Sequence, residues 1–456
     1  MLQPQCNRRW RTSLSSIEAN DPWVGVSRLG LWGFGREGAA VLELARARGV
    51  DDVVVYSTGT EELPDGVVRA GSSNELGDVD LVVRSPGVPI YAADYRVVAD
   101  QVATSTLTNL WMQRHGSRTI AVAGTKGKST VTTLAVALFH ACGIDAKIGG
   151  NVGVPLYPDD HVSERQWVVA ELSSFQISDL TWFPALAVLT SFHPEHLDWH
   201  RSLENYRRDK LRLLDGVDAE SRVAIGAFGA AEALQALDLA WPQPVSDMSG
   251  TQLFVDGDVV ADIAGSYLDD NVGIVSAQLA LEVLIRAGVD VVQYGDAISD
   301  AMVRFRGLPH RRQIICQTNS IIAVDDTLAT TPIAAARTID EYDGRTVAAI
   351  VGGGDRGLDF GPLIAKLTSR FGTTHAICVP DTGTDRVGPH LNENEVNVVH
   401  ADNIEQAVDH AVELLTADPS GGVILLSPAS PSHNRYANYR ELGERFKQQC
   451  ELRLGT

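Results

Sequence analysis

The sequence predicts an α/β fold of three domains, each built on a mainly parallel β-sheet. Two glycine-rich turns, Gly33–Gly38 and Gly124–Ser129, each lie between an apolar run and a stretch with helical spacing. Beyond residue 309, five apolar runs alternate with helical stretches. Strands that alternate with helices in this way are typical of doubly wound parallel sheets.

The length of the chain, 456 residues, exceeds that of one ordinary domain. We expect a flexible N-terminal extension over residues 1–21, because this segment is polar and precedes the first apolar run. We expect the three domains to span residues 22–117, 118–308 and 309–456.

The composition excludes several classes of protein. Hydrophobic residues make up 44% and charged residues 21% of the chain, as in globular proteins. The net charge of −20 disfavours binding to nucleic acid or to an anionic membrane. No apolar stretch approaches the length of a membrane span, and no signal peptide is evident. The five scattered cysteines indicate a reducing compartment, so we expect a cytoplasmic protein.

The central glycine-rich turn has the features of a phosphate-binding loop. The run Thr119–Ala123 predicts a buried strand, and a helix is predicted from Ser129 onward. Helix N-termini bind phosphate through free N–H groups, while Lys128 would reach the outer phosphates and Ser129 would hold magnesium. Val122 stands where the full P-loop pattern has glycine, so an ordinary glycine-rich turn is the alternative. The predicted ATP-binding loop comprises Gly124, Thr125, Lys126, Gly127, Lys128, Ser129 and Thr130.

The first glycine-rich turn follows the G-x-G-x-x-G pattern and predicts a Rossmann-like domain, because a helix and the strand Val53–Tyr56 come next. NAD is disfavoured, since Tyr56–Ser57 stands where an acidic residue would bind the ribose. Gly33 and Gly35 are candidates for contact with another nucleotide. A purely structural turn is the alternative, because a lone motif of this kind is weak.

Two predicted strands of the central domain end in residues suited to magnesium. Glu171 follows the apolar run Gln166–Ala170, and His196 comes shortly after the run Ala185–Phe192. Ligands bind at the carboxyl ends of parallel strands, so both side chains are expected to face the same crevice as Ser129. A carboxylate and an imidazole there could hold magnesium near a γ-phosphate. Taken alone, His196 could equally be a surface or capping residue.

The sequence resembles the Mur ligase family over nearly its whole length beyond the extension. The resemblance rests on G-T-K-G-K-S-T from Gly124, E-L-S-S-F-Q from Glu171, G-L-P-H-R from Gly307, and L-L-S-P-A from Leu425. The hexapeptide is the hallmark of the branch that adds glutamate. The phosphate loop is also similar to that of the folylpolyglutamate synthases. The resemblance implies a central P-loop ATPase-type sheet between two Rossmann-like domains.

The resemblance also implies roles for individual residues. The family's Y-x-x-x-K motif places at Lys210 a carbamylated lysine that holds a second magnesium ion. Phe192 and Glu195 depart from the family pattern beside His196, where asparagine and aspartate are usual. We expect Lys128, His196 and Lys210 to be catalytic, and we expect metal binding by Ser129, Glu171, His196 and Lys210. Further expected ATP contacts are Asn271, Arg311 and Asp326. Further expected substrate contacts are Ser85, Gly87, Asn151, Ser173, Arg356, Ser432 and Tyr439.

The predicted amino-acid pocket departs from the pattern of the D-glutamate-adding enzyme. Leu328 and Arg356 each replace a lysine, and Tyr439 replaces a phenylalanine. Losing one ammonium group and exchanging another for a guanidinium should move the place where carboxylates bind. The W-G-x-G-R-E-G segment Trp32–Gly38 matches a branch that adds L-glutamate. We favour L-glutamate, and the alternative is drift in a D-glutamate enzyme.

The function implied by the resemblance is an ATP-dependent ligase of peptidoglycan precursor synthesis. It would join glutamate to UDP-N-acetylmuramoyl-L-alanine through an acyl phosphate, using ATP and two Mg²⁺ ions. We expect a monomer, and an epimerase acting on an L-glutamate product. A folylpolyglutamate synthase-like ligase is a rival, which the Rossmann-like first domain disfavours. A non-catalytic ATP-binding regulator is another, which the retained Lys128, Glu171, His196 and Lys210 disfavour.

Overall fold

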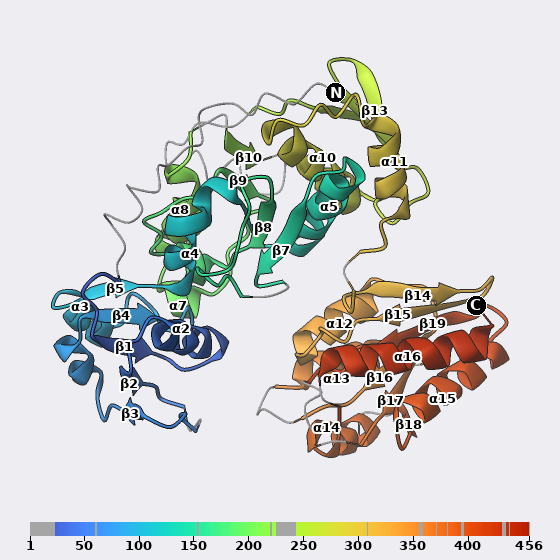
Figure 1. Ribbon diagram of the computed structural model, residues 1–456. Helices are drawn as coiled ribbons and strands as arrows, with labels where there is room; N and C mark the ends of the chain where they lie inside the picture. The colour runs from blue at the N-terminus through green and yellow to red at the C-terminus, as the bar shows by residue number, and fades with distance from the viewer. Residues whose placement is uncertain are drawn as a thin grey trace. The chain divides into compact units, whose positions relative to one another are not determined.

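The computed structural model describes two compact units, Met1–Phe305 and Arg306–Thr456 (Figure 1). The described residues are 23–455 without 60–61, 153–154, 219–220, 225–242, 308, 355–358, 371, 381, 394–395, 431–434 and 437. The predicted extension, 1–21, lies outside them. Two parallel sheets occur in the first unit and a mainly parallel one in the second, so the predicted α/β class is confirmed. The three domain boundaries stay predictions.

The first sheet is entirely parallel and has the strand order β3-β2-β1-β4-β5. Alternate residues of β1 pack on opposite faces: Leu29 and Leu31 lie against α2, whereas Trp32 lies against Tyr95 of α3. The strands are β1 (Arg28–Trp32), β2 (Asp52–Tyr56), β3 (Val67–Arg69), β4 (Leu81–Arg84) and β5 (Ala103–Ser105). The helices are α2 (Arg36–Ala47), η2 (Ser73–Asp78), α3 (Ala93–Ala99), α4 (Leu107–His115) and η3 (Gly116–Arg118).

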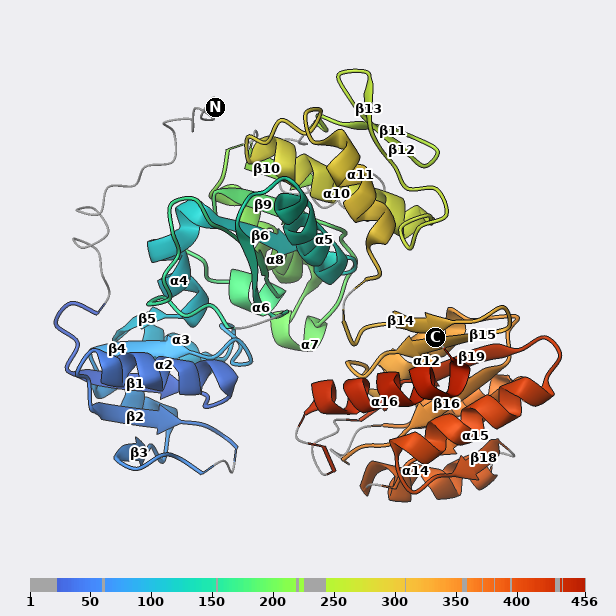
Figure 2. The ribbon, with the colours of Figure 1, turned by 45° about the vertical axis from the view of Figure 1, so that its right-hand side comes forward.

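The second sheet is also parallel, with the order β10-β9-β6-β8-β7. Its central strands are buried on both faces, which explains their continuous apolar runs. Helices α5, α10 and α11 cover one face (Figure 2), and α4 and α8 contribute to the core on the other. The strands are β6 (Thr119–Ala123), β7 (Ala146–Gly150), β8 (Trp167–Glu171), β9 (Leu186–Leu189) and β10 (Arg222–Ala224). The helices are α5 (Lys128–Ala141), α6 (Ser174–Ile177), α7 (Leu197–His200), α8 (Leu203–Asp215), α10 (Asn271–Arg286) and α11 (Gly295–Arg304).

A small antiparallel sheet that the sequence analysis did not identify precedes α10. Its strands are β11 (Asp247–Ser249), β12 (Gln252–Val255) and β13 (Asp258–Asp262). They are short and mix apolar with polar residues, so no long apolar run marks them.

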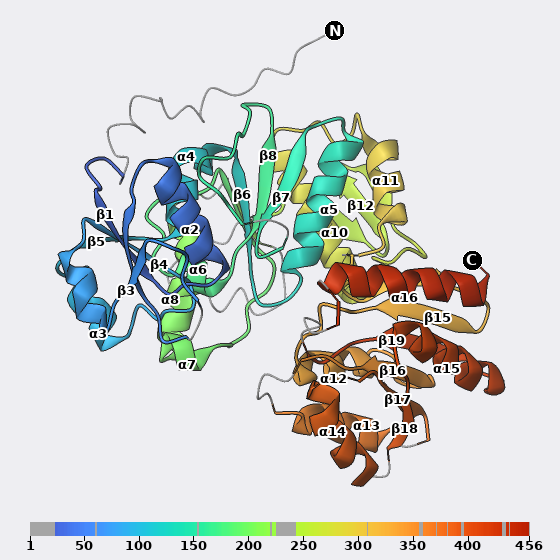
Figure 3. The same cartoon turned by 60° about the horizontal axis from the view of Figure 1, so that its bottom comes forward.

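The third sheet, in the second unit, has the order β14-β15-β19-β16-β17-β18. Its five parallel strands are those predicted from the apolar runs, and β14 adds an antiparallel edge. Helices α15 and α16 pack on one face (Figure 3), and α12 and α13 pack on the other. The strands are β14 (Gln313–Gln317), β15 (Ile321–Asp325), β16 (Val347–Val351), β17 (Thr374–Cys378), β18 (Asn397–His400) and β19 (Gly422–Leu426). The helices are α12 (Pro332–Asp340), α13 (Gly361–Ser369), α14 (Thr382–Glu393), α15 (Ile404–Ala417) and α16 (Tyr439–Leu454).

In the part of the chain that the structure describes, no helix is both long and apolar enough to cross a bilayer.

Candidate nucleotide site

The predicted phosphate loop forms the turn between β6 and α5. Gly124 has φ +140° and Gly127, at the N-terminus of α5, has φ +83°, both in the region that favours glycine. A Cβ atom on Gly124 would lie 2.1 Å from Oγ1 of Thr190. The N–H group of Lys126 donates to Oγ of Ser191 at 2.8 Å, so the residues after β9 hold the turn. Such a preformed turn at a helix N-terminus is an anion-binding site.

Lys128 folds back over the turn. Its Nζ atom donates to the carbonyl oxygens of Gly124 at 3.0 Å and of Thr125 at 3.2 Å. The ammonium group therefore lies beside the loop whose N–H groups would meet phosphate. Thr130 is half-buried in the first turn of the helix.

Ser129 and Glu171 form the buried pair that the sequence analysis predicted as metal ligands. The Ser129 hydroxyl donates to Oε2 of Glu171 at 2.5 Å, and the carboxylate stands at the end of β8, directly beside β6. Both residues are buried. A hydroxyl and a carboxylate next to a phosphate loop are the oxygen ligands that Mg²⁺ prefers, so these residues fit one magnesium ion. The described residues contain no ready-made cluster of three or more His, Cys, Asp or Glu side chains suited to a metal.

Lys210 of α8 reaches the same turn from the opposite face of the sheet. Its Nζ atom donates to Oγ1 of Thr125 at 3.0 Å and lies 4.7 Å from the ring centre of Tyr206. Burial is the main cause that lowers the pKa of Lys210 to about 7, and the nearby Lys128 lowers it further. The ammonium form of Lys210 is therefore disfavoured relative to that of a lysine in water.

His196 is not buried with this group. It lies at the start of α7 with φ +54°, its side chain is 53% exposed, and its ring packs 4.9 Å from that of Phe175. Its Nε2 atom lies 4.0 Å from a carboxylate oxygen of Glu195. The metal-binding role of His196 stays a prediction.

The two predicted substrate turns of the first sheet meet each other. The Ser85 hydroxyl donates to the carbonyl oxygen of Gly33 at 3.0 Å, and Gly33 has φ +86°. Gly35 caps α2, and space is open around the Cα atoms of both Gly35 and Gly87. An open backbone at adjacent strand ends is what close approach of a nucleotide requires.

Two other predicted substrate residues lie near the carboxyl end of β8: Ser173 follows β8 itself, and Asn151 follows the paired strand β7. Ser173 caps α6, where its side chain and that of Gln176 form a capping box. Asn151 is exposed, and its backbone N–H donates to the carbonyl oxygen of Glu171 at 2.9 Å. Both residues therefore lie close to the buried metal-ligand pair.

The sequence analysis missed Arg84, which shapes the Ser85–Gly87 turn. Its side chain is buried, and its Nη1 atom donates to the carbonyl oxygens of Ser85 and Val88 at 3.2 and 2.7 Å. On the other side, Nη2 lies 2.9 Å from Oδ2 of Asp179, just beyond α6. Arg84 thus connects the first sheet to the segment that follows Ser173. A charged residue ending an otherwise apolar strand was the signal that could have revealed it.

The second unit holds the remaining described candidates. Asp326 is buried after β15 and accepts hydrogen bonds from Thr338 at 2.7 Å and Ser427 at 3.2 Å; burial raises its pKa to about 6. Arg311 is exposed. Tyr439 begins α16, with its ring 5.4 Å from that of His310. Arg356 and Ser432 lie outside the described residues, and the side chain of Asn271 lies outside the described side chains.

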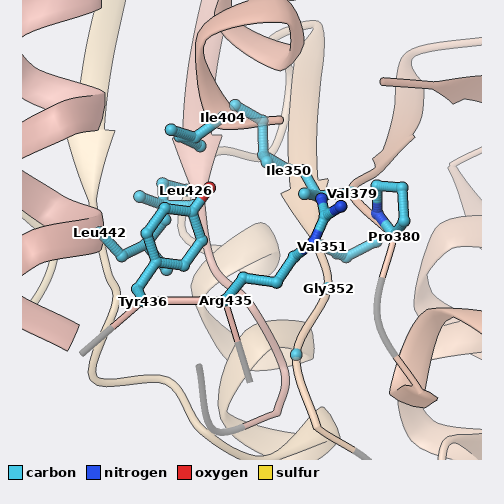
Figure 4. A pocket seen from close by; sticks show the side chains of 11 residues that line it. Ile350, Val351, Gly352, Val379, Pro380, Ile404, Leu426, Arg435, Tyr436 and Leu442 are labelled. Carbon is cyan, nitrogen blue, oxygen red and sulfur yellow. The ribbon is translucent and has the colours of Figure 1, made fainter. Parts of the chain in front are cut away.

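A pocket opens at the carboxyl ends of β16, β17 and β19 (Figure 4). Its wall is largely apolar, with Gly352 and Gly353 at the end of β16 and Tyr436 beside Leu426. The guanidinium group of Arg435 borders it, and Nη1 donates to the carbonyl oxygen of Asp402 at 2.7 Å. The pocket lies where open α/β sheets bind ligands.

A phosphate-binding turn, a hydroxyl–carboxylate pair and a buried lysine at one edge of a parallel sheet define a P-loop nucleotide-binding enzyme. Comparison with known proteins gives the family. The Mur ligase middle domain matches residues 122–235, and the Mur ligase glutamate ligase domain matches residues 310–430.

Curated relatives match nearly the whole chain. A UDP-N-acetylmuramoyl-L-alanine–L-glutamate ligase from a Micromonospora species is 36% identical over 92% of this chain and 95% of the relative. A protein of the same name from Salinispora tropica is 36% identical over 92% of this chain and 96% of its own. A third protein of this name, from Xanthomonas oryzae, is 32% identical over 92% of this chain and 94% of its own length. The chain therefore belongs to the Mur ligase family, as the sequence analysis predicted, and is an ATP-dependent ligase.

Solved structures of low sequence identity share the fold. UDP-N-acetylmuramate-alanine ligase from Thermotoga maritima aligns with a TM-score of 0.50 at 16% identity, over 93% of this chain and 99% of that chain. MurF from Acinetobacter baumannii gives a TM-score of 0.50 at 15% identity, over 83% and 93%. Membership of the family implies ATP and usually Mg²⁺, whereas the number of metal sites stays a prediction.

Proposed function

We propose that this chain joins L-glutamate to UDP-N-acetylmuramoyl-L-alanine at the expense of ATP. The observation that carries the proposal is the match, at 36% identity over 92% of the chain, to relatives named for that reaction. The residues of the amino-acid pocket support it, because Leu328 and Arg356 replace the two lysines of the D-glutamate pattern.

The reaction proceeds in two transfers. A carboxylate oxygen of the nucleotide sugar attacks the γ-phosphorus of ATP, and ADP leaves. The amine of glutamate then attacks the carbonyl carbon of the acyl phosphate, inorganic phosphate leaves, and the amine loses a proton. Lys128 and the N–H groups of the turn stabilise the charge on the transferred phosphoryl group. Arg311 and Asp326 are further ATP contacts, and Asn271 contacts the adenine.

Ser129 and Glu171 would hold one Mg²⁺ ion, and His196 and a carbamylated Lys210 would hold a second. Carbamylation joins a neutral amine to CO₂ and releases a proton, so it needs the unprotonated lysine. The pKa of about 7 for Lys210 supports this modification, because an ordinary lysine is almost wholly protonated at neutral pH. The carbamate turns a buried cation into an oxygen ligand. Bound there, the metal ions would neutralise charge between the two anionic reactants.

The substrates occupy sites on the three larger sheets. Gly33, Gly35, Ser85 and Gly87 line the nucleotide-sugar site at the first sheet, and Asn151 and Ser173 complete it. Arg356, Ser432 and Tyr439 bind the incoming glutamate. We place the enzyme in the cytoplasm as a monomer with the three domains 22–117, 118–308 and 309–456, and an epimerase acts on its product.

The test is ATP-dependent phosphate release with UDP-N-acetylmuramoyl-L-alanine and either L- or D-glutamate. We expect release with L-glutamate and less than a hundredth of that rate with D-glutamate. Activity with D-glutamate alone would overturn the assignment of L-glutamate as the substrate, but the assignment of the chain as a glutamate ligase would stand. Activity with neither amino acid would overturn the substrate assignment. The matched control omits the nucleotide sugar, which should abolish release.

A further inference from the structure

Outside the phosphate loop, a chain of buried and half-buried hydrogen bonds connects the first sheet to α8. Asp209 of α8 is 2% exposed, and its two carboxylate oxygens lie 2.7 and 2.9 Å from the hydroxyl of Tyr91, which donates to them. Its Oδ2 atom also lies 2.6 Å from Nδ1 of His200. The Nε2 atom of His200 lies 2.9 Å from Oγ of Ser174. The chain therefore runs from the segment after β4, through α8 and α7, to the start of α6.

The donors and acceptors along this chain are mutually satisfied. A carboxylate oxygen accepts, so Nδ1 of His200 donates to Asp209, while Nε2 of His200 pairs with the hydroxyl of Ser174, which can donate or accept. The hydroxyl of Tyr91 in turn accepts from Nη2 of Arg208 at 3.2 Å. Fully satisfied buried networks of this kind rigidify the elements that they join.

The order Ser174–His200–Asp209 is that of a hydrolytic catalytic triad, but the surroundings exclude that chemistry. His200 is 0% exposed, and three aromatic rings enclose it at centroid distances of 4.6 to 5.6 Å. A substrate carbonyl cannot reach a serine in such a site, whereas a nucleophile has to be accessible. The network holds elements in place rather than attacking a substrate.

Two successive residues of α8 face two different parts of the site. Neighbouring helical residues point about 100° apart. Asp209 contacts Tyr91, four residues beyond the Ser85–Gly87 turn, whereas Lys210 donates to Oγ1 of Thr125 in the phosphate loop at 3.0 Å. A shift of α8 would therefore move Lys210 relative to the phosphate loop and Asp209 relative to the Ser85–Gly87 turn.

We propose that Asp209 is a positioning residue for the ligase reaction. Through its hydrogen bonds to Tyr91 and His200, Asp209 holds Lys210 and the Ser85–Gly87 turn in place relative to the phosphate loop. This inference rests on the proposed function. The reaction requires the carboxylate of one substrate to meet the γ-phosphate of another, and misplacement by about 1 Å can cost about a hundredfold in rate.

The first test is Tyr91→Phe, which removes only the hydroxyl. We expect kcat for phosphate release to fall about tenfold or more, while the dissociation constants of a non-hydrolysable ATP analogue and of UDP-N-acetylmuramoyl-L-alanine change less than about twofold. The matched control is Tyr157→Phe. Tyr157 is also half-buried and packs against the core of the first sheet, and its hydroxyl has no hydrogen bond within the described part of the chain. It should keep the wild-type kcat.

Asp209→Asn is the second variant, since it keeps the shape and removes the charge. We expect it to lose at least as much kcat as Tyr91→Phe, and the double variant to lose no more than Asp209→Asn alone, as for residues acting as a unit. A wild-type kcat in Tyr91→Phe would overturn the inference. So would a loss explained by a lower Tm together with weaker binding of the ATP analogue, because that would indicate a purely structural role. If the wild type is active and Tyr91→Phe is equally active, only the positioning role is refuted and the proposed function stands. An inactive wild type refutes the proposed function and the inference with it.

Discussion

Gly124→Ala should disable the phosphate loop for two separable reasons. The first is the backbone, because φ +140° is a conformation that alanine adopts only with strain of about 1–3 kcal/mol. The second is space, because the new Cβ atom would lie 2.1 Å from Oγ1 of Thr190 and 3.0 Å from the backbone nitrogen of Ser191. The Thr190 hydroxyl donates a hydrogen bond to the carbonyl oxygen of Lys126 at 2.5 Å, so the Thr190 side chain cannot move away without losing that bond. Overpacking adds about 1–3 kcal/mol.

The two costs sum to about 2–6 kcal/mol, shared between lost stability and a displaced loop. Isothermal titration with a non-hydrolysable ATP analogue should show at least a tenfold loss of affinity, and urea denaturation should show the lost stability. The control is Gly143→Ala, where φ is +72° but nothing lies within 4 Å of the new Cβ. It should lose about 1–2 kcal/mol from backbone strain alone and bind nucleotide normally. Wild-type affinity in Gly124→Ala would refute the argument.

Three further predictions follow from buried charges, each read by urea denaturation. Lys210→Met should abolish activity yet raise the free energy of unfolding, relative to the uncarbamylated protein, by on the order of 4 kcal/mol at pH 7. The reason is that the pKa of the unmodified Lys210 amine is lowered from 10.5 to about 7, so its cost to stability is full below pH 7 and vanishes as the pH rises to 10.5. An equal gain at pH 7 and above pH 10 would contradict this. The pKa of Asp326 is raised to about 6 from 3.8, so its contribution to stability is greatest below pH 3.8 and declines up to pH 6. The free energy of unfolding of Asp326→Asn should therefore rise by about 3 kcal/mol relative to that of the wild type as the pH goes from 4 to 7. A stability difference between variant and wild type that stays constant over this range would count against the prediction. Arg84→Met leaves the partly exposed carboxylate of Asp179 without its ion-pair partner and should cost about 1–3 kcal/mol. An unchanged free energy of unfolding would mean that water solvates this carboxylate fully.

Periodicity and turn chemistry predicted most elements of the three sheets. The apolar run Thr119–Ala123 and the five runs of the second unit are strands, because parallel strands buried on both faces need continuous apolar sequence. Strands β11 to β14 escaped prediction for the converse reason. Their residues are partly exposed, and β14 is an antiparallel edge, so their sequences mix polar and apolar residues.

The candidate site was only partly predictable. Ser129 and Glu171 were expected to meet because both follow strands that end at the same edge of one sheet, and they lie 2.5 Å apart. Asp209 and Arg84 were missed because their roles depend on partners more than 90 residues away. His196 carries a family motif, but a motif does not determine how exposed its side chain is.

The sequence by itself determined the α/β class, the phosphate loop and the family, since these reside in local patterns: strand, glycine turn and helix within about thirty residues. Only the tertiary structure decided the electrostatics. The pKa of Lys210 falls to about 7 because folding removes its ammonium group from water and brings it near Lys128, which lies 82 residues earlier in the sequence of this chain. Likewise, Tyr91 and Asp209 become one network only when the first sheet packs beside α8. Desolvation and long-range hydrogen bonding are properties of the packed molecule, and no local pattern encodes them.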